Sequence, residues 1–396
     1  SGALKDLDLE PQESKKILIP VEKFEMLPFN EYFLDIEFRL KKKKGLLPKG
    51  YLIAWEQLPL INFNTIKLEF DLNISQENYP KLNDVTETNN EIVITGNDFE
   101  IIFSKKTATM DSWTFQGKNI LLRGPKPNFW RTPTDNDFGN NMPKRMAVWK
   151  HATDEAQVNE IKVDNYDTSV GIEVFYNFPS VESMGSILYV IYGDGRILVY
   201  NKFEIEKGTL PNMPKVGISM QIPKEFDAMT WFGRGPHENY LDRKSSAKVD
   251  IYSGKVSDQI HPYIRPQESG NKTDVRWATF RNVDGDGLLV RGLLSLNASH
   301  YLQEDYDHGF GEMKSGATGN IKTTKQQRHS IDMVERDLIN LDIDLIQMGL
   351  GGEDSWWAQP LEKYQIKPKN YDYSFTLMPI KSDENPVELN KNAFLK

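Results

Sequence analysis

Four segments of the sequence are dense in turn-forming residues. Between them they carry carboxylates, carboxamides, guanidinium groups and aromatic rings. They are Asn128–Gly139, Trp231–Arg243, Arg265–Lys272 and Gly351–Trp357. A sugar presents apolar C–H faces and a rim of hydroxyls, which an indole plate beside paired donors and acceptors matches. The segments are therefore compatible with carbohydrate binding. For the first three, the favoured interpretation from the residues alone is that buried Arg–carboxylate pairs and Asx turns tie long loops to the sheets.

The last of these segments ends in two adjacent tryptophans, Trp356 and Trp357, after a Gly-Gly-Glu-Asp run. Successive side chains of a strand point to opposite faces, so one regular strand cannot bury both rings. The pattern indicates that one ring is displayed, and it leaves display for recognition and simple packing equally open. Trp356 and Trp357 are therefore our candidate substrate-binding residues. Weaker candidates come from the second and third segments: Glu238, Asn239, Arg243, Glu268 and Asn271.

Other kinds of chemistry find little support. The chain has no cysteine, and its six histidines are scattered without a metal-binding spacing. Phosphate-loop, dinucleotide and nucleophile-elbow motifs are absent. The run Asn282–Gly287 hints at a calcium loop, but it lacks the later bidentate glutamate and is more typical of a hairpin turn. We expect no metal and no cofactor in this chain, and no spacing identifies a catalytic acid/base pair.

The elements that must position these segments are strands, because the hydrophobic period is two almost throughout. A tight Gly-Asn turn joins the predicted strands 91–95 and 99–103. Further strands are expected at 171–178, 187–192, 196–206, 288–296 and 371–379, and one short helix at 144–151. Many short strands separated by Gly, Pro, Asn and Asp are typical of sandwiches and barrels. The sequence predicts an all-β fold.

One predicted strand has a clear alternation. Leu341, Ile343 and Leu345 alternate with Asp342 and Asp344. This pattern predicts one buried face and one face in water.

The clearest break in composition is the polar, turn-rich stretch between Asn73 and Asn90, where we expect a linker. Strands are predicted before it at Ser14–Pro20, Tyr32–Arg39, Tyr51–Gln57 and Lys67–Leu72. The prediction is a first domain over residues 1–75 and a second over 76–396.

Composition excludes two classes of partner. The 396 residues carry 48 Lys and Arg against 57 Asp and Glu, a formal charge of −9. Such a balance lacks the basic footprint that nucleic acid or an anionic membrane surface selects. No apolar run approaches the roughly 20 residues that span a bilayer. We expect a soluble protein, cytoplasmic or periplasmic. The start at Ser1-Gly2-Ala3 without Met suggests a fragment.

The same segments carry a resemblance to a known family. Gly124–Asp137, Gly233–Arg243, Pro262–Asp274 and Gly349–Trp356 resemble, in order, the signatures of the C-terminal domain of the large bacterial β-galactosidases of glycoside hydrolase family two. Tyr51–Gln57 resembles the end of the preceding immunoglobulin-like domain. The resemblance covers essentially the whole chain.

The resemblance implies that residues 1–75 are an N-terminally truncated immunoglobulin-like sandwich. Residues 76–396 would be an antiparallel supersandwich similar to galactose mutarotase and of carbohydrate-binding type. The family's retaining hydrolysis uses two glutamates on a TIM barrel that holds magnesium and sodium. That barrel is not in this chain, so no catalytic residue is assigned. In the family, the Trp of the Asp-Ser-Trp motif, here Trp356, stacks on the sugar; Trp357 departs from the family pattern.

Three functions remain in competition. The leading one is a C-terminal fragment of a β-galactosidase, inactive alone, that shapes the substrate entrance and helps assembly. Its expected partners are a galactoside or other sugar, the missing barrel, and further copies in a homo-oligomer. The second is a free-standing carbohydrate-binding module. The third is a sugar epimerase of mutarotase type, for which His237, His261 or Glu268 would be the acid and base.

Overall fold

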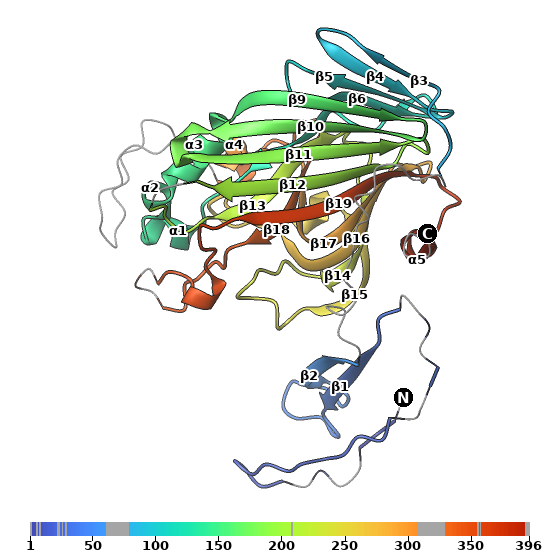
Figure 1. Ribbon diagram of the computed structural model, residues 1–396. Helices are drawn as coiled ribbons and strands as arrows, with labels where there is room; N and C mark the ends of the chain where they lie inside the picture. The colour runs from blue at the N-terminus through green and yellow to red at the C-terminus, as the bar shows by residue number, and fades with distance from the viewer. Residues whose placement is uncertain are drawn as a thin grey trace. The chain divides into compact units, whose positions relative to one another are not determined.

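The computed structural model describes residues 2–392 apart from 5–6, 8, 22–23, 26, 28–29, 61–78, 207–208, 307–328, 355 and 357. The chain divides into two compact units (Figure 1). One comprises Ser1–Lys67 with Lys391–Lys396, and the other comprises Leu68–Asn390. Each unit is described by itself below.

The described residues of the smaller unit form one antiparallel pair, β1 (Phe33–Arg39) and β2 (Leu52–Pro59). These strands confirm the predictions at Tyr32–Arg39 and Tyr51–Gln57. The strand predicted at Ser14–Pro20 is wrong, because its described backbone pairs with no other strand. Exposed apolar residues there, such as Leu18, have no sheet face to pack against. The strand predicted at Lys67–Leu72 lies outside the described residues.

The larger unit is built from two antiparallel sheets and short helices. The five-stranded sheet has the order β3-β4-β5-β6-β7. The twelve-stranded sheet runs β15-β14-β16-β17-β19-β12-β11-β10-β9, with β13 between β18 and β8, and β18 also paired to β17. The bounds are β3 Asp84–Glu87, β4 Glu91–Thr95, β5 Phe99–Ser104, β6 Thr109–Phe115, β7 Lys118–Asn119, β8 Arg123–Asn128, β9 Gln157–Tyr166, β10 Ser169–Phe178, β11 Ser183–Tyr192, β12 Ile197–Ile205, β13 Lys215–Ile222, β14 Ala228–Gly235, β15 Lys248–Lys255, β16 Lys272–Arg281, β17 Gly287–Ser299, β18 Ile339–Gln347 and β19 Tyr371–Ile380.

The helices are short. They are α1 Asp135–Gly139, α2 Met142–Arg145, α3 Ala147–Asp154, α4 Gln303–Tyr306 and α5 Pro386–Asn392, with 3-10 turns at Pro179–Val181, Ser257–Gln259, Ser330–Asp332 and Glu362–Tyr364. The helix predicted at 144–151 corresponds to α2 and α3. The predicted all-β, antiparallel class is confirmed, and so are the predicted strands at 91–103, 171–206, 288–296 and 371–379.

Part of the expected linker is instead a strand. Residues 84–87 form β3, which pairs with β4 in the five-stranded sheet. Only Val85 of this strand is partly buried, and the other residues are exposed. An outer strand of this kind can be mostly polar, so its composition resembles that of a linker and did not predict a strand. Residues 73–78 lie outside the described part of the chain.

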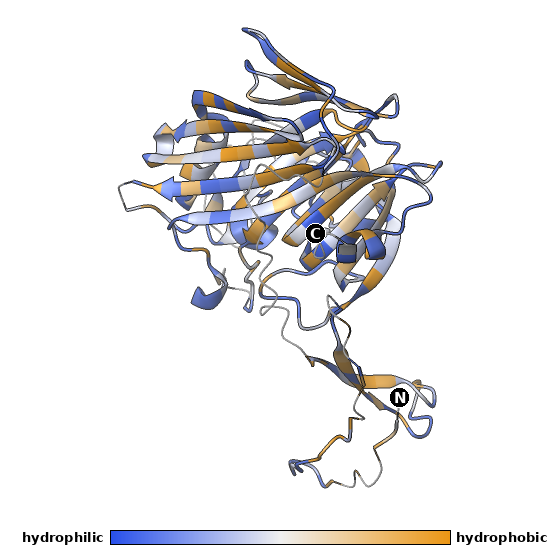
Figure 2. Ribbon diagram, turned by 45° about the vertical axis from the view of Figure 1, so that its right-hand side comes forward, coloured by the Kyte–Doolittle hydropathy of each residue, from blue (hydrophilic) through white to orange (hydrophobic). Residues whose placement is uncertain are grey.

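One hydrophobic core joins the two sheets of the larger unit. Its largest fully buried side chains include Trp113 from β6, Trp149 from α3 and Trp231 from β14. Along many strands of the large sheet, hydrophobic and hydrophilic residues alternate (Figure 2). This alternation directs the apolar side chains to the core and explains why the period-two pattern predicted the strands.

Strand β17 divides the large sheet into two branches. Its first residues, Gly287–Arg291, pair with β19, while Ser295–Ser299 pair with β18. Gly292 lies between, where an added Cβ would come within 3.2 Å of Phe375 Cβ. A side chain at this position would therefore require a small shift of its neighbours where the strand passes from one partner to the other.

Strand register brings three of the four chemically rich segments to the same end of the strands. Asn128 at the end of β8 and Asp344 near the end of β18 both face Gly217 of β13. Lys272 at the start of β16 faces Leu296 of β17, which itself faces Ile343 of β18. The loops that follow β8 and β18 and precede β16 thus leave the sheet at the same level.

The alternation prediction for Asp342 and Asp344 is wrong in one respect. Both carboxyls are buried, with Asp344 only 1% exposed. The reason is Lys215 of β13, whose Nζ lies 2.9 Å from Asp342 Oδ2 and 3.4 Å from Asp344 Oδ2. Both faces of β18 are covered, one by hydrophobic packing and the other by a buried charge cluster.

Candidate functional site

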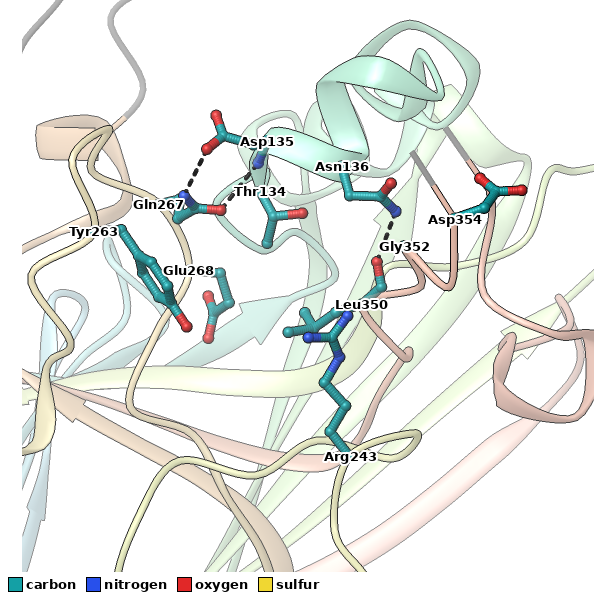
Figure 3. Close-up of a pocket in the computed structure, with 10 residues that line it drawn as sticks. All are labelled: Thr134, Asp135, Asn136, Arg243, Tyr263, Gln267, Glu268, Leu350, Gly352 and Asp354. Carbon is teal, nitrogen blue, oxygen red and sulfur yellow. Dashed lines mark hydrogen bonds between the residues drawn. The ribbon is translucent and has the colours of Figure 1, made fainter. Parts of the chain in front are cut away.

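An open pocket of about 440 Å³ lies where these loops meet (Figure 3). Its volume is in the range of roughly 300–1,000 Å³ typical of small-molecule sites. The residues that line it are Thr134, Asp135, Asn136, Arg243, Tyr263, Gln267, Glu268, Leu350, Gly352 and Asp354. All four segments singled out in the sequence contribute to this lining.

The first wall is the start of α1. Thr134 caps the helix: its side chain accepts from the backbone N of Asp137, and the Asp137 carboxylate accepts from the backbone N of Thr134. Asp137 also pairs with Arg131, both being fully buried. Arg131 Nη2 donates to both Asp137 carboxylate oxygens at 2.9 Å, and Nη1 donates to the Met348 carbonyl at 2.7 Å. This pair fastens α1 to the end of β18.

The second wall is tied to the first by two reciprocal hydrogen bonds. Gln267 Nε2 donates to Asp135 Oδ2 at 3.0 Å, and Gln267 Oε1 accepts from the Asp135 backbone N at 2.9 Å. Arg265 lies over the Phe138 ring, 3.8 Å from its centroid. The segment before β16 is therefore held against α1 along the pocket edge.

The third wall is the Gly351-Gly352 loop, where both glycines have positive φ values of 67° and 79°. Asn136 Nδ2 donates to the carbonyls of Leu350 and Ala358, each at 2.9 Å, and so closes the base of the loop. The Asp242 carboxylate accepts from the backbone N of Leu350 at 3.0 Å and of Gly351 at 2.8 Å. Two segments distant in sequence, α1 and the loop after β14, thus fix one glycine turn.

Trp356 sits beyond this fastened base, and 80% of its surface is exposed. Its backbone N donates to Asp354 Oδ1 at 2.8 Å, which is a local turn contact. Trp357 lies outside the described residues, so substrate binding by its ring stays a prediction. The Trp356 ring is thus displayed on this loop, and its role in sugar binding stays a prediction.

Glu268 forms the floor of the pocket and is 8% exposed. Its Oε1 accepts from Asn297 Nδ2 at 2.9 Å and from the Tyr240 hydroxyl at 3.5 Å. Burial raises the pKa of Glu268 to about 7, against the lowering influence of Lys215 and Arg131. A carboxyl group with a pKa of about 7 thus faces the pocket.

Behind the floor is the Lys215–Asp342–Asp344 cluster. Burial raises the pKa of Asp344 well above its usual range, and the nearby carboxyls of Asp342 and Glu268 add to this effect. Burial by itself would lower the pKa of Lys215, but the two aspartates hold it above its ordinary value. The cluster therefore retains a charged lysine inside the fold.

The weaker sequence candidates fall into two groups. Arg243 and Glu268 line the pocket. Asn239 and Asn271 are fully buried behind it, where Asn271 Nδ2 donates to the Asn239 carbonyl and Asn239 Oδ1 accepts from the Thr273 backbone N. Their bonds hold the loops together, and a direct role in binding stays a prediction.

Glu238 lies between these groups. It accepts from the Tyr263 hydroxyl and, at 2.8 Å through Oε2, from the Gly270 backbone N. Glu238 therefore positions Tyr263, whose ring forms part of the pocket wall (Figure 3).

Several lining residues were not singled out individually from the sequence: Thr134, Asp135, Asn136, Tyr263, Gln267, Leu350, Gly352 and Asp354. Most lie inside the four segments, so local density of turn formers and polar groups was the available signal. Tyr263 and Leu350 lie just outside them, and for these two residues the available signal was the family resemblance of Pro262–Asp274 and Gly349–Trp356.

The two histidines considered for an epimerase lie elsewhere. His237 Nε2 is 2.9 Å from Ser246 Oγ, and the His261 ring lies 4.3 Å from the Tyr263 ring, centroid to centroid. Neither belongs to the pocket lining. Within the described part of the chain, no group of three or more His, Asp or Glu side chains could hold a metal ion.

The run Asn282–Gly287 is the hairpin turn between β16 and β17, as predicted. Two of its carboxylates, Asp284 and Asp286, bind Lys118 Nζ at 2.9 and 3.0 Å.

Of the helices formed by described residues, none combines the length and apolar character needed to cross a membrane.

Comparison with protein families gives two matches. Residues 95–377 match the family described as "Beta galactosidase small chain", and residues 1–61 match "Beta-galactosidase, domain 4". A β-galactosidase of Priestia megaterium is 33% identical over 357 residues, which cover 89% of this chain and 32% of the relative. A β-galactosidase of Halalkalibacterium halodurans is 26% identical, with 91% and 34% covered. The chain spans about a third of the length of these curated relatives.

Solved structures show a weaker similarity. The galactose 1-epimerase of Lactobacillus acidophilus aligns with 76% of this chain and 99% of its own, at a TM-score of 0.43 and 9% identity. These values are too low to transfer a function from that enzyme.

Proposed function

The chain belongs to the β-galactosidase family, and we propose that it forms the C-terminal part of an enzyme that hydrolyses terminal non-reducing β-D-galactosides. The family matches support this assignment. The hydrolysis retains configuration through two glutamates, a nucleophile and an acid/base, which lie in a barrel outside this chain. The magnesium and sodium that the resemblance implies belong to that barrel too. This chain alone is inactive in hydrolysis.

The contribution of this chain is carbohydrate contact at the substrate entrance, through Trp356. This proposal rests mainly on the exposure of Trp356, whose indole is 80% exposed. The base of its loop is held in place by hydrogen bonds to Asn136 and Asp242. A Trp that is mostly exposed forgoes most of the free energy of burying its large apolar ring, so a displayed indole favours a role in recognition. Stacking on the C–H face of a sugar would use that surface.

The test is a titration of galactose and lactose into the chain, followed by NMR and Trp fluorescence, with the wild type beside Trp356→Ala. One stacked ring contributes on the order of 1–2 kcal/mol, so the dissociation constant should be weaker than millimolar. Saturable binding that is lost in the variant supports the proposal. Val283→Ala, which truncates another fully exposed apolar residue in the β16–β17 turn, is the matched control. Equal binding by wild type and Trp356→Ala would refute the role of Trp356.

A second function is a free-standing carbohydrate-binding module. The observation in its favour is that the pocket is formed within the chain's own larger unit. Affinity in the isolated chain equal to that of the full enzyme would favour this function. The homo-oligomer expected of the full enzyme is tested by light scattering on the purified protein.

A further inference from the structure

The pocket beside the Trp356 loop has an unusual balance of charge. Its lining carries three carboxyl groups, from Asp135, Glu268 and Asp354, and one guanidinium, from Arg243. We propose that this pocket is a second saccharide site, separate from the Trp356 surface, which binds neutral or amino sugars and rejects acidic sugars. The proposal rests on the carbohydrate-binding function argued above and adds to it a site and a selectivity.

The lining carboxylates retain capacity to accept hydrogen bonds. An ionised carboxylate offers about four lone-pair sites. Asp135 Oδ2 accepts from Gln267, and its Oδ1 lies 3.7 Å from Arg265 Nη1. Asp354 Oδ1 accepts only the Trp356 backbone N among described groups. Glu268 accepts from Asn297 and Tyr240 at Oε1, and the Gln347 side chain also hydrogen-bonds to its carboxyl. Sugar hydroxyls are donors, so an acceptor-rich pocket is complementary to a polyol.

The pocket also offers a donor and a ring. Arg243 Nη2 donates to the Gly351 carbonyl, which holds the guanidinium at the rim. The Tyr263 ring is held by its hydroxyl's bond to Glu238. Figure 3 shows the Glu268 carboxyl, the Tyr263 side chain and the Arg243 guanidinium turned toward the pocket. A planar wall beside fixed polar groups is the arrangement that a pyranose ring requires.

Charge then determines which sugars enter. A carboxylate brought by the ligand would meet three protein carboxyls and one guanidinium in the lining, with a second guanidinium, that of Arg265, 3.7 Å from Asp135. Like charges placed together across a binding surface weaken binding, to a degree that depends on how far solvent screens them. A stacking surface such as an exposed indole is far less sensitive to ligand charge, so selectivity separates this site from Trp356.

The charge of Glu268 depends on pH, so the assay pH must be chosen to keep this carboxyl ionised. The charged and titratable groups that face it are Lys215, Arg131, Asp342, Asp344, Tyr240 and Tyr306. Because the pKa of Glu268 is raised to about 7, the assay is run at pH 8, where the carboxyl is mostly ionised.

The experiment titrates galactose, galactosamine and galacturonate into the whole chain by NMR at low salt. We expect galactose and galactosamine to bind, and galacturonate to bind about tenfold more weakly or worse. The difference should shrink in Glu268→Gln and in Asp354→Asn, and at 1 M salt, but not in Trp356→Ala. Asp164→Asn, which removes an exposed carboxylate on β9, is the matched control. Asp354 is itself exposed, so its variant decides the outcome if Glu268→Gln fails to fold.

Three results would overturn the proposal. Galacturonate binding as tightly as galactose refutes the charge selectivity. Galactose binding that depends on Trp356 but is unchanged in both pocket variants refutes the second site while leaving the function proposed for Trp356 intact. If none of the three sugars binds, the proposed saccharide site does not exist in this chain.

Discussion

Replacing Asn136 with aspartate should open the loop that displays Trp356. The change keeps the size and shape of the side chain but removes the two N–H groups that reach the Leu350 and Ala358 carbonyls at 2.9 Å. Each such bond contributes about 1 kcal/mol, and the new carboxylate would also face two carbonyl oxygens. The closed loop should lose about 2 kcal/mol or more relative to its open forms.

Hydrogen exchange measures this directly. The backbone N–H groups of Leu350 and Gly351 bond to Asp242, and that of Gly352 bonds to the Ala358 carbonyl at 3.3 Å. A loss of about 2 kcal/mol corresponds to an increase of about 30-fold in the population of the open loop, and so in the exchange rate of these amides. Amides of β17 should exchange as in the wild type.

The control is Asn165→Asp, the same change of side chain at an exposed position of β9. Exchange of the loop amides within threefold of the wild type in Asn136→Asp would refute the assignment of Asn136 as the fastener of the loop. So would an equal increase throughout the larger unit, because the variant would then have destabilised the whole fold.

The remaining predictions concern buried charge. Lys215→Met leaves Asp342 and Asp344 without their cation and should lower the free energy of unfolding at pH 7 by about 3–5 kcal/mol, measured by urea denaturation, whereas Lys202→Met at an exposed position should change it by under about 0.5 kcal/mol. Because the pKa of Glu268 is raised from 4.5 to about 7, its protonated form favours the fold: this stability is complete below pH 4.5 and is lost as the pH rises to 7, by about 3 kcal/mol. Glu268→Gln should flatten that part of the pH profile, and an unchanged slope would contradict the assignment. Burial lowers the pKa of Lys272 from 10.5 to about 8, so its charge opposes folding below pH 8 and the penalty is relieved as the pH rises to 10.5; Lys272→Met should abolish this rise in stability, which thermal melts from pH 8 to 10.5 would detect.

The fold class followed from local pattern. Alternating apolar residues predicted most strands of the larger unit because each strand has one face toward a common core. The same logic failed at Asp342 and Asp344. Alternation shows that two faces differ in polarity, but it cannot show that the polar face is covered by a lysine from another strand.

The Ser14–Pro20 prediction failed for a related reason. A run of apolar residues can form a strand, but whether it does depends on an edge to pair with. Nothing in the residues themselves supplies that partner.

The sequence by itself determined the family, the all-β class and the segments that carry the chemistry, because composition, period and motif order are properties of the linear chain. Only the tertiary structure decided which residues of those segments meet. Register along β8, β13, β17 and β18 brings loops more than 200 residues apart in sequence to the same end of the strands, as the bond between Asn136 and Ala358 shows. The tertiary structure places Glu268 and Arg243 in the lining of the pocket, and it buries Asn239 and Asn271 behind that lining. Burial, charge pairing and pKa arise from contacts between distant residues, and no local pattern records them.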